Sequence, residues 1–232
     1  MKKLGIVGGT GPATTSRYYL GVIEAARPFL PAGRNPEIAI ESLDCGAVFE
    51  ALERPGTGAL ASIMTQAAGR LATSGAQVVA FAGFTAHLVL EEVREALPGV
   101  EVVSILDPVR ELARLRGWRR VGLLGSPGVL SSPSLFSPLE AAGVKLLRPD
   151  ESQWPEIRRL VETEVEFGIE RPESQHWMAE LARGLCLRGG AEAILLANTD
   201  FPKYFERIAL PAETIDPVAL HIAALARRIV SD

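Results

Sequence analysis

Cysteine and histidine are both scarce in this sequence. It contains two cysteines, Cys45 and Cys186, and three histidines among 232 residues. Metal sites built on cysteine and histidine need several ligands at characteristic spacings, and these residues are scattered along the chain. Two distant cysteines also provide no disulfide framework, so the cytoplasm, where thiols stay reduced, is the expected compartment. We therefore expect neither a bound metal ion nor a disulfide.

Basic charge and long apolar runs are lacking as well. Lysine and arginine number 24 against 28 aspartates and glutamates, which gives a formal net charge of −4. A nucleic-acid-binding surface normally requires an excess of basic residues. No apolar run approaches the roughly 18 residues of a membrane-spanning helix. The short apolar run at residues 4–7 meets a glycine-rich turn too early for a secretion signal. The sequence thus argues against nucleic-acid and membrane partners.

Two similar segments, one in each half of the chain, carry the clearest pattern. Residues 75–87 read GAQVVAFAGFTAH, and residues 190–202 read GAEAILLANTDFP. A short apolar run that follows a glycine is typical of a buried strand in a parallel sheet. Open α/β sheets bind ligands beyond the carboxyl ends of their strands, and these segments place Thr85 and Thr199 there. We therefore expect two strand ends that face one ligand cleft.

Two further pairs of segments indicate an internal duplication. They recur in the same order and at about the same spacing: LGIVGGTGP at 4–12 with VGLLGSPG at 121–128, and ILDPV at 105–109 with TIDPV at 214–218. Such repetition favours a duplicated unit over the general likeness of βα segments. The predicted fold is α/β, with two pseudo-symmetric doubly wound parallel-sheet domains and the ligand cleft between them. The predicted domains are residues 1–107 with 208–232, and residues 108–207.

The glycine-rich turn after the first predicted strand reads Gly8-Gly9-Thr10-Gly11-Pro12. A turn of this kind between a strand and a helix offers backbone N–H groups to an anion. It lacks the third glycine of the dinucleotide fingerprint and the lysine of a phosphate-binding loop. A carboxylate ligand or a tight structural turn therefore fits this segment better than a nucleotide does.

Taken together, the motifs resemble the aspartate/glutamate racemase superfamily, and most closely its aspartate racemase branch. The matching segments follow one another over nearly the whole chain: Gly8–Pro12, Thr85-Ala86-His87, Leu123-Leu124-Gly125 with Ser131-Ser132, and Thr199-Asp200 with Pro202. The resemblance implies a cofactor-independent racemase for a small carboxylate. One cysteine thiolate would remove the α-proton, and an opposite thiol would return a proton to the other face. Threonines and backbone N–H groups would hold the carboxylate.

The sequence departs from the family at both cysteines. The family's first motif reads Cys-Asn-Thr-Ala-His, and this chain has Gly83-Phe84-Thr85-Ala86-His87. The second motif reads Cys-Thr-Glu, and this chain has Asn198-Thr199-Asp200. Glycine has no side chain to move a proton, and an amide is neither a useful acid nor a useful base near pH 7. We therefore expect a pseudoenzyme or an enzyme of altered chemistry, because the two-thiol mechanism is not available.

Three other residues are candidates for proton transfer. Asp200 is either a general base or a carboxylate that holds loop N–H groups. His87 is either a proton donor or, as we favour, a histidine at a helix start that is bonded to the backbone. Cys45, just past the second predicted strand, is either a relocated thiol or a small buried apolar residue. Cys186 lies within an amphipathic helix, where we expect it only to pack.

The candidate substrate-binding residues, taken from the resemblance and from the polar loop tips, are Gly9, Thr10, Gly11, Arg54, Phe84, Thr85, Ser126 and Thr199. The tip at Ser126 either bonds a ligand or is a plain polar loop. Arg54 matches an arginine that contacts the distal carboxylate, and Phe84 adds bulk where the family has asparagine. A lysine that some aspartate racemases place before a glycine has no counterpart, since Glu166-Phe167-Gly168 stands in its region. Apolar spacing predicts a helix over residues 152–167, which includes part of that region.

The expected function is that of a cytoplasmic racemase-family protein that binds a small carboxylate or amino acid without a cofactor. Two alternatives remain. One is an isomerase or lyase of a small diacid, with Asp200, His87 or Cys45 supplying the chemistry. The other is a non-catalytic amino-acid-binding protein. Binding with turnover distinguishes the first alternative from the second. The resemblance leaves a homodimer open.

Overall fold

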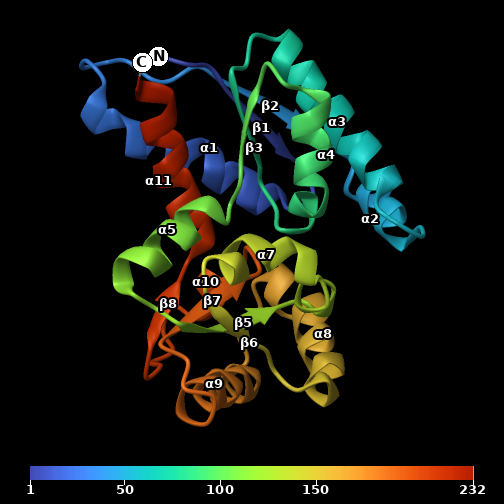
Figure 1. Ribbon diagram of the computed structural model, residues 1–232, viewed down its shortest axis with the longest axis vertical. Helices are drawn as coiled ribbons and strands as arrows, with labels where there is room; N and C mark the ends of the chain where they lie inside the picture. Colours follow the sequence, from blue (N-terminus) through green and yellow to red (C-terminus); the bar gives the residue numbers. More distant parts are fainter. Residues whose placement is uncertain (232) are drawn as a thin grey trace. The chain divides into compact units, whose positions relative to one another are not determined.

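The computed structural model describes residues 1–231 and divides the chain into two compact units. The first unit comprises Met1–Pro108 and the segment that begins at Val218, and the second comprises Val109–Pro217. Each unit contains one four-stranded sheet, and all strand pairs are parallel. Helices surround both sheets (Figure 1). The predicted α/β class with two parallel sheets is confirmed.

In the first unit the strand order is β2-β1-β3-β4. The strands are β1 (Leu4–Gly8), β2 (Ile38–Ser42), β3 (Val78–Phe81) and β4 (Glu101–Val103). The two central strands, β1 and β3, are buried along their whole length, as expected for apolar runs covered on both faces. The chain winds outward from this central pair in both directions. The carboxyl ends of β1 and β3 therefore form the topological switch point, where open α/β sheets bind their ligands.

The second unit repeats this arrangement with the order β6-β5-β7-β8. Its strands are β5 (Arg120–Gly125), β6 (Lys145–Leu147), β7 (Ala193–Ala197) and β8 (Glu213–Ile215). Its switch point lies between β5 and β7. The predicted second domain boundary, at residue 208, is wrong. Because β8 pairs with β7 and completes the sheet as its edge strand, the chain leaves the second unit only after Pro217.

The helices follow the strands in both units. Those of the first unit are α1 (Pro12–Ala26), η1 (Arg27–Phe29), α2 (Cys45–Glu53), α3 (Gly58–Thr73), η2 (Thr85–Val89), α4 (Leu90–Ala96) and α11 (Pro217–Val230). Those of the second are α5 (Asp107–Arg116), α6 (Pro127–Leu130), α7 (Pro133–Ala141), η3 (Glu151–Gln153), α8 (Trp154–Thr163), η4 (Val165–Phe167), α9 (Pro172–Leu187) and α10 (Phe201–Tyr204). The helix expected over 152–167 is interrupted at Glu164, which has φ −132° and ψ −60°. No helix within residues 1–231 is both long and apolar enough to cross a membrane.

Packing in the first unit explains how α3 and α11 are held. Gly5 on β1 lets α3 approach closely, because a Cβ at this position would lie 3.0 Å from Cβ of Leu71. Gly21 on α1 does the same for α11, because a Cβ there would lie 3.0 Å from Cδ1 of Ile222. The last helix thus packs onto the first unit, as the repeated sequence pattern predicts.

Candidate functional site

The glycine-rich turn after β1 is closed by its own helix. The N–H of Gly9 donates to Oγ1 of Thr15 at 3.0 Å, and this hydroxyl donates to the carbonyl of Gly11 at 3.0 Å. Gly9 has φ +98°, and a Cβ there would collide with the backbone of Leu43. The N–H of Gly9 is therefore used within the turn, which corrects its predicted role as a ligand donor. Thr10 and Gly11, at the tip of the turn, are half-buried.

Three residues that the sequence singled out gather beside this turn. A Cβ at Gly83 would lie 3.3 Å from Oγ1 of Thr10. Gly83 has no positive φ, so its backbone accepts a side chain. Cys45 is the first residue of α2, and its half-buried thiol donates to the carbonyl of Thr10 at 3.6 Å. Thr10, Gly83 and Cys45 therefore meet at the carboxyl end of the β1–β3 pair.

Both ring nitrogens of His87 lie within hydrogen-bond distance of the backbone. Its ring is 5% exposed, Nδ1 lies 2.8 Å from the carbonyl oxygen of Gly83, and Nε2 lies 3.0 Å from the backbone N of Ile105. The N–H of Ile105 can only donate, so Nε2 accepts this hydrogen bond. The ring proton is therefore on Nδ1, which donates a hydrogen bond to the carbonyl of Gly83. Burial lowers the pKa of His87 from 6.5 to about 4, with Arg94 adding to the effect. Both ring nitrogens are used in hydrogen bonds to the backbone, and the ring is neutral at pH 7.

The remaining predicted residues of the first unit differ in how they are placed. Thr85 is half-buried at the start of η2, directly after β3, and Phe84 beside it is 4% exposed. Arg54 is exposed and caps the far end of α2. The nine residues of α2 separate it from Cys45 by about 13 Å along the axis. The structure does not bring Arg54 to the turn at Thr10.

At the corresponding place in the second unit, the loop after β7 is closed by Asn198. Its Oδ1 accepts the N–H of Asp200 at 2.9 Å, so the amide holds the turn. Thr199 and Asp200 are half-buried, and Ser126, after β5, is half-buried as well. Burial and then the charge of Asp200 raise the pKa of Glu166. An acidic residue thus lies near Asp200 in the region where the resemblance implied a lysine.

Some polar residues of this unit were missed by the sequence reading. The side chain of Glu164 is 1% exposed, and Nη1 of Arg159 lies 3.3 Å from its Oε1. The hydroxyl of Tyr204 has no hydrogen-bond partner among residues 1–231. Burial, with the charge of Glu164, raises the pKa of Tyr204 to about 12. A glutamate in an amphipathic helix is normally solvated, so local spacing offered no signal for this burial.

Cys186 and metal binding complete the residue-level picture. Cys186 is buried on α9, and burial raises the pKa of its thiol, consistent with a packing residue. Within residues 1–231, no three histidine, cysteine, aspartate or glutamate side chains are grouped so as to hold a metal ion.

Residues 7–225 match the family described as Asp/Glu/Hydantoin racemase. The chain belongs to this family. The aspartate/glutamate racemase resemblance drawn from the motifs is thereby confirmed.

Solved structures of racemases share the fold. An aspartate racemase homologue from Pyrococcus horikoshii is 30% identical, with a TM-score of 0.84 and full coverage of both chains. The aspartate racemase of Picrophilus torridus is 18% identical, with a TM-score of 0.70 and coverage of 99% of this chain and 94% of that one. A glutamate racemase from Francisella tularensis, solved with D-glutamate, is 17% identical with a TM-score of 0.66, covering 98% and 80%. These racemases share the two-sheet architecture seen here.

Proposed function

We propose that this racemase-family protein binds a small carboxylate or amino acid and does not perform two-thiol racemisation. The loops that carry the candidate donors lie at the carboxyl ends of β1 and β3 in the first unit and of β5 and β7 in the second. The observation that carries this proposal is the chemistry of positions 83 and 198. Gly83 has no side chain, and the amide of Asn198 accepts a backbone N–H within its own turn. Neither position can take a proton from an α-carbon.

The groups that remain are suited to binding. The hydroxyls of Thr10, Thr85, Thr199 and Ser126 follow the central strands of the two sheets, and each of these residues is half-buried. Hydroxyls and backbone N–H groups in fixed positions are good donors to a carboxylate. Without a base beside the α-carbon, such donors hold the ligand but do not exchange its proton. No cofactor is needed for this function.

The test is proton NMR of the purified protein in D₂O with a pool of amino acids and small dicarboxylates. We expect line broadening for at least one carboxylate and no loss of α-proton signal. Exchange of an α-proton would contradict the proposed lack of activity. Absence of broadening for every member of the pool would contradict the proposed ligand class.

A second candidate function rests on Cys45. Its thiol lies beside Thr10, the residue toward which a Cβ at Gly83 would point. Cys45 is half-buried and is the first residue of α2. One thiol in this place suits an isomerase or lyase acting on a small diacid. In the same NMR assay this function predicts turnover that Cys45→Ser abolishes, whereas Asp200→Asn tests the remaining candidate base.

A further inference from the structure

His87 joins two backbone segments that are distant in the sequence. Nδ1 donates to the carbonyl of Gly83, in the loop after β3, and Nε2 accepts the N–H of Ile105, beyond the end of β4. Both bonds need one tautomer of the neutral ring. The ring is confined by its neighbours, with the ring of Phe81 at 5.5 Å and that of His221 at 6.1 Å between centroids. His221 is itself bonded through Nδ1 to the hydroxyl of Tyr18 at 2.8 Å.

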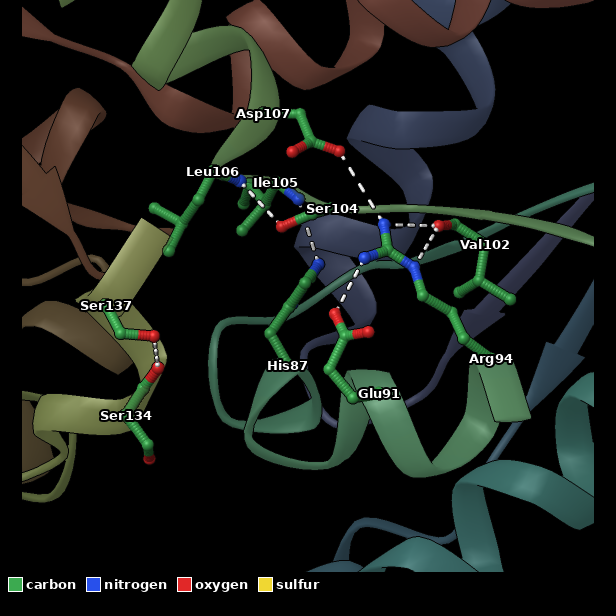
Figure 2. A network of polar contacts seen from close by, with 10 residues as sticks. All are labelled: His87, Glu91, Arg94, Val102, Ser104, Ile105, Leu106, Asp107, Ser134 and Ser137. Carbon is green, nitrogen blue, oxygen red and sulfur yellow. Dashed lines mark hydrogen bonds and ion pairs between the residues drawn. The ribbon is translucent and has the colours of Figure 1, made fainter. Parts of the chain in front are cut away.

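The segment that receives the second bond is held by further side chains. Nε and Nη2 of Arg94 donate to the carbonyl of Val102 at 3.0 and 2.8 Å, and Nη2 lies 3.6 Å from Oδ2 of Asp107. Oγ of Ser104 accepts the N–H of Leu106 at 3.1 Å. Figure 2 shows these contacts meeting along one stretch of chain. That stretch ends where the first unit ends, at Pro108.

We propose that His87 is a positioning residue that couples the loop at Gly83–Thr85 to the connection at Ile105–Asp107, through which the chain enters the second unit. The proposal rests on the proposed function in taking Gly83–Thr85 as a ligand loop. A shift of the Gly83 carbonyl moves the Nδ1 end of a rigid ring, and the Nε2 end carries the shift to Ile105.

Protonation breaks this link, because a protonated ring has no acceptor for the N–H of Ile105. The charged and titratable groups near the ring are Arg94, Asp107 and His221. Arg94 opposes protonation of His87 and Asp107 favours it, while the charge of His87 lowers the pKa of His221. Burial outweighs these charges and keeps the ring neutral at pH values above about 4. The coupling is therefore intact at neutral pH.

Two substitutions separate the two bonds. His87→Asn places an amide NH₂ near the position of Nδ1, so it keeps the donor to Gly83 and loses the acceptor for Ile105. His87→Gln places a carbonyl near the position of Nε2, so it keeps the acceptor and loses the donor. The hydrogen-exchange rate of the Ile105 amide, measured by NMR, reports directly on the hydrogen bond from Ile105 to Nε2. We expect exchange at Ile105 to rise about tenfold or more in His87→Asn and to stay near the wild-type rate in His87→Gln.

The coupling itself is tested without a ligand. Gly83→Ala introduces a Cβ 3.3 Å from Oγ1 of Thr10 and so perturbs the loop. The matched control is Gly11→Ala, on the neighbouring turn, where a Cβ would lie 3.5 Å from Oγ1 of Thr14. We expect Gly83→Ala to shift the amide resonance of Ile105 in the wild-type background and not in His87→Asn. Gly11→Ala should leave Ile105 unmoved in both.

The amide shifts at Ile105 test whether His87 couples the two segments. Equal shifts at Ile105 with and without His87, or a shift of the same size from Gly11→Ala, would overturn the proposal. If His87→Asn does not fold, the wild-type protein provides the test: the protection factor of the Ile105 amide must fall as the pH falls through about 4, and a pH-independent protection factor overturns the proposal. Because no ligand is used, failure of the proposed carboxylate function leaves this result unaffected. A titration with D-glutamate or L-aspartate then asks whether binding moves Ile105 as Gly83→Ala does.

Discussion

Gly83 and Asn198 follow the inner strands β3 and β7 in corresponding places, and the chain uses them differently. At Gly83 the backbone carbonyl makes the contact, because it accepts a hydrogen bond from the ring Nδ1–H of His87. At Asn198 the side chain works, because it closes the turn to Asp200. Both positions are half-buried and neither has a positive φ, so each can accept a cysteine. Cysteines at these two positions would therefore test whether the other residues of the site still support proton transfer.

Restoring both thiols, by Gly83→Cys with Asn198→Cys, should produce α-proton exchange in a bound amino acid. The two thiols restore the acid and the base of the family's mechanism, and a positioned pair of this kind contributes about 100-fold or more. Loss of the α-proton signal in D₂O measures the rate. Asn198→Cys also removes one turn hydrogen bond, at a cost of about 1 kcal/mol in the free energy of unfolding.

The two single variants are the matched controls, and each should exchange at least about 100-fold more slowly than the double variant. A double variant that folds and binds the ligand but shows no exchange would contradict the match between these positions and the family cysteines. If one single variant exchanged the α-proton as fast as the double variant, a residue already present, such as Cys45, would be supplying the second acid or base.

At the scale of elements, the first unit depends on a buried histidine pair between η2 and α11. Burial lowers the pKa of His87 from 6.5 to about 4, and burial lowers that of His221 well below 6.5, with the charge of His87 adding to the effect. In the unfolded chain both histidines bind protons near pH 6.5. Between about pH 6.5 and 4 the unfolded state therefore binds more protons than the folded state, and stability falls as the pH falls.

We expect the free energy of unfolding of the wild-type protein to decline over this window, with His87 contributing up to about 3 kcal/mol. Urea unfolding at pH values between 7.5 and 4.5 measures the decline. His87→Gln removes one of the two groups, so its stability should decline less over the same range. A variant with the same slope as the wild type would show that His87 does not stay neutral in the folded state.

The contact between α1 and α11 is the second element-scale feature. Gly21 leaves room for Ile222, so Gly21→Val should overpack this contact and lower the free energy of unfolding by about 1–3 kcal/mol. The matched control is Gly69→Ala on α3, where a new Cβ meets nothing within 4 Å. That change should raise stability by about 0.5–1 kcal/mol, because alanine is the better helix former. Chemical denaturation measures the free energy of unfolding of both variants. Equal changes from the two substitutions would contradict the close packing of α11 on α1.

At the scale of the whole molecule, one α/β unit occurs twice in a single chain. The strand orders β2-β1-β3-β4 and β6-β5-β7-β8 are the same, and each switch point carries a threonine-containing loop. Family membership over residues 7–225 covers both units. Each switch point carries its own hydroxyl donors for the proposed carboxylate ligand, so each unit can be tested by itself.

Thr85→Ala tests the loop of the first unit and Thr199→Ala tests the loop of the second, and loss of a ligand donor should weaken ligand-dependent stabilisation. A ligand at 100 times its dissociation constant stabilises the folded state by about 2.7 kcal/mol. Loss of one charge-assisted hydrogen bond, of about 1.5–3 kcal/mol, removes most of that gain. Thermal unfolding of each variant, with and without the carboxylate identified by NMR, measures this ligand-dependent stabilisation. Loss in only one of the two variants would confine the site to a single unit.

Local pattern was enough to predict a large part of this protein. Short apolar runs after glycine predict the central strands, since burial on both faces leaves a continuous apolar run. The order of the repeated segments predicts two α/β units, and the motifs at the strand ends predict the racemase family. The presence of Thr85 and Thr199 at strand ends also follows from sequence, because the end of an apolar run marks the end of a strand.

Other features depended on residues that meet only in the folded chain. The sequence cannot show that Cys45 lies beside Thr10, that His87 accepts the N–H of Ile105, or that β8 completes the second sheet. Nor does local spacing show that Glu164 is buried or that Arg54 lies at the far end of its helix. Periodicity records which face of an element is buried and how its backbone is shaped. Contacts between distant segments depend on how those elements pack, and that was decided by the tertiary structure.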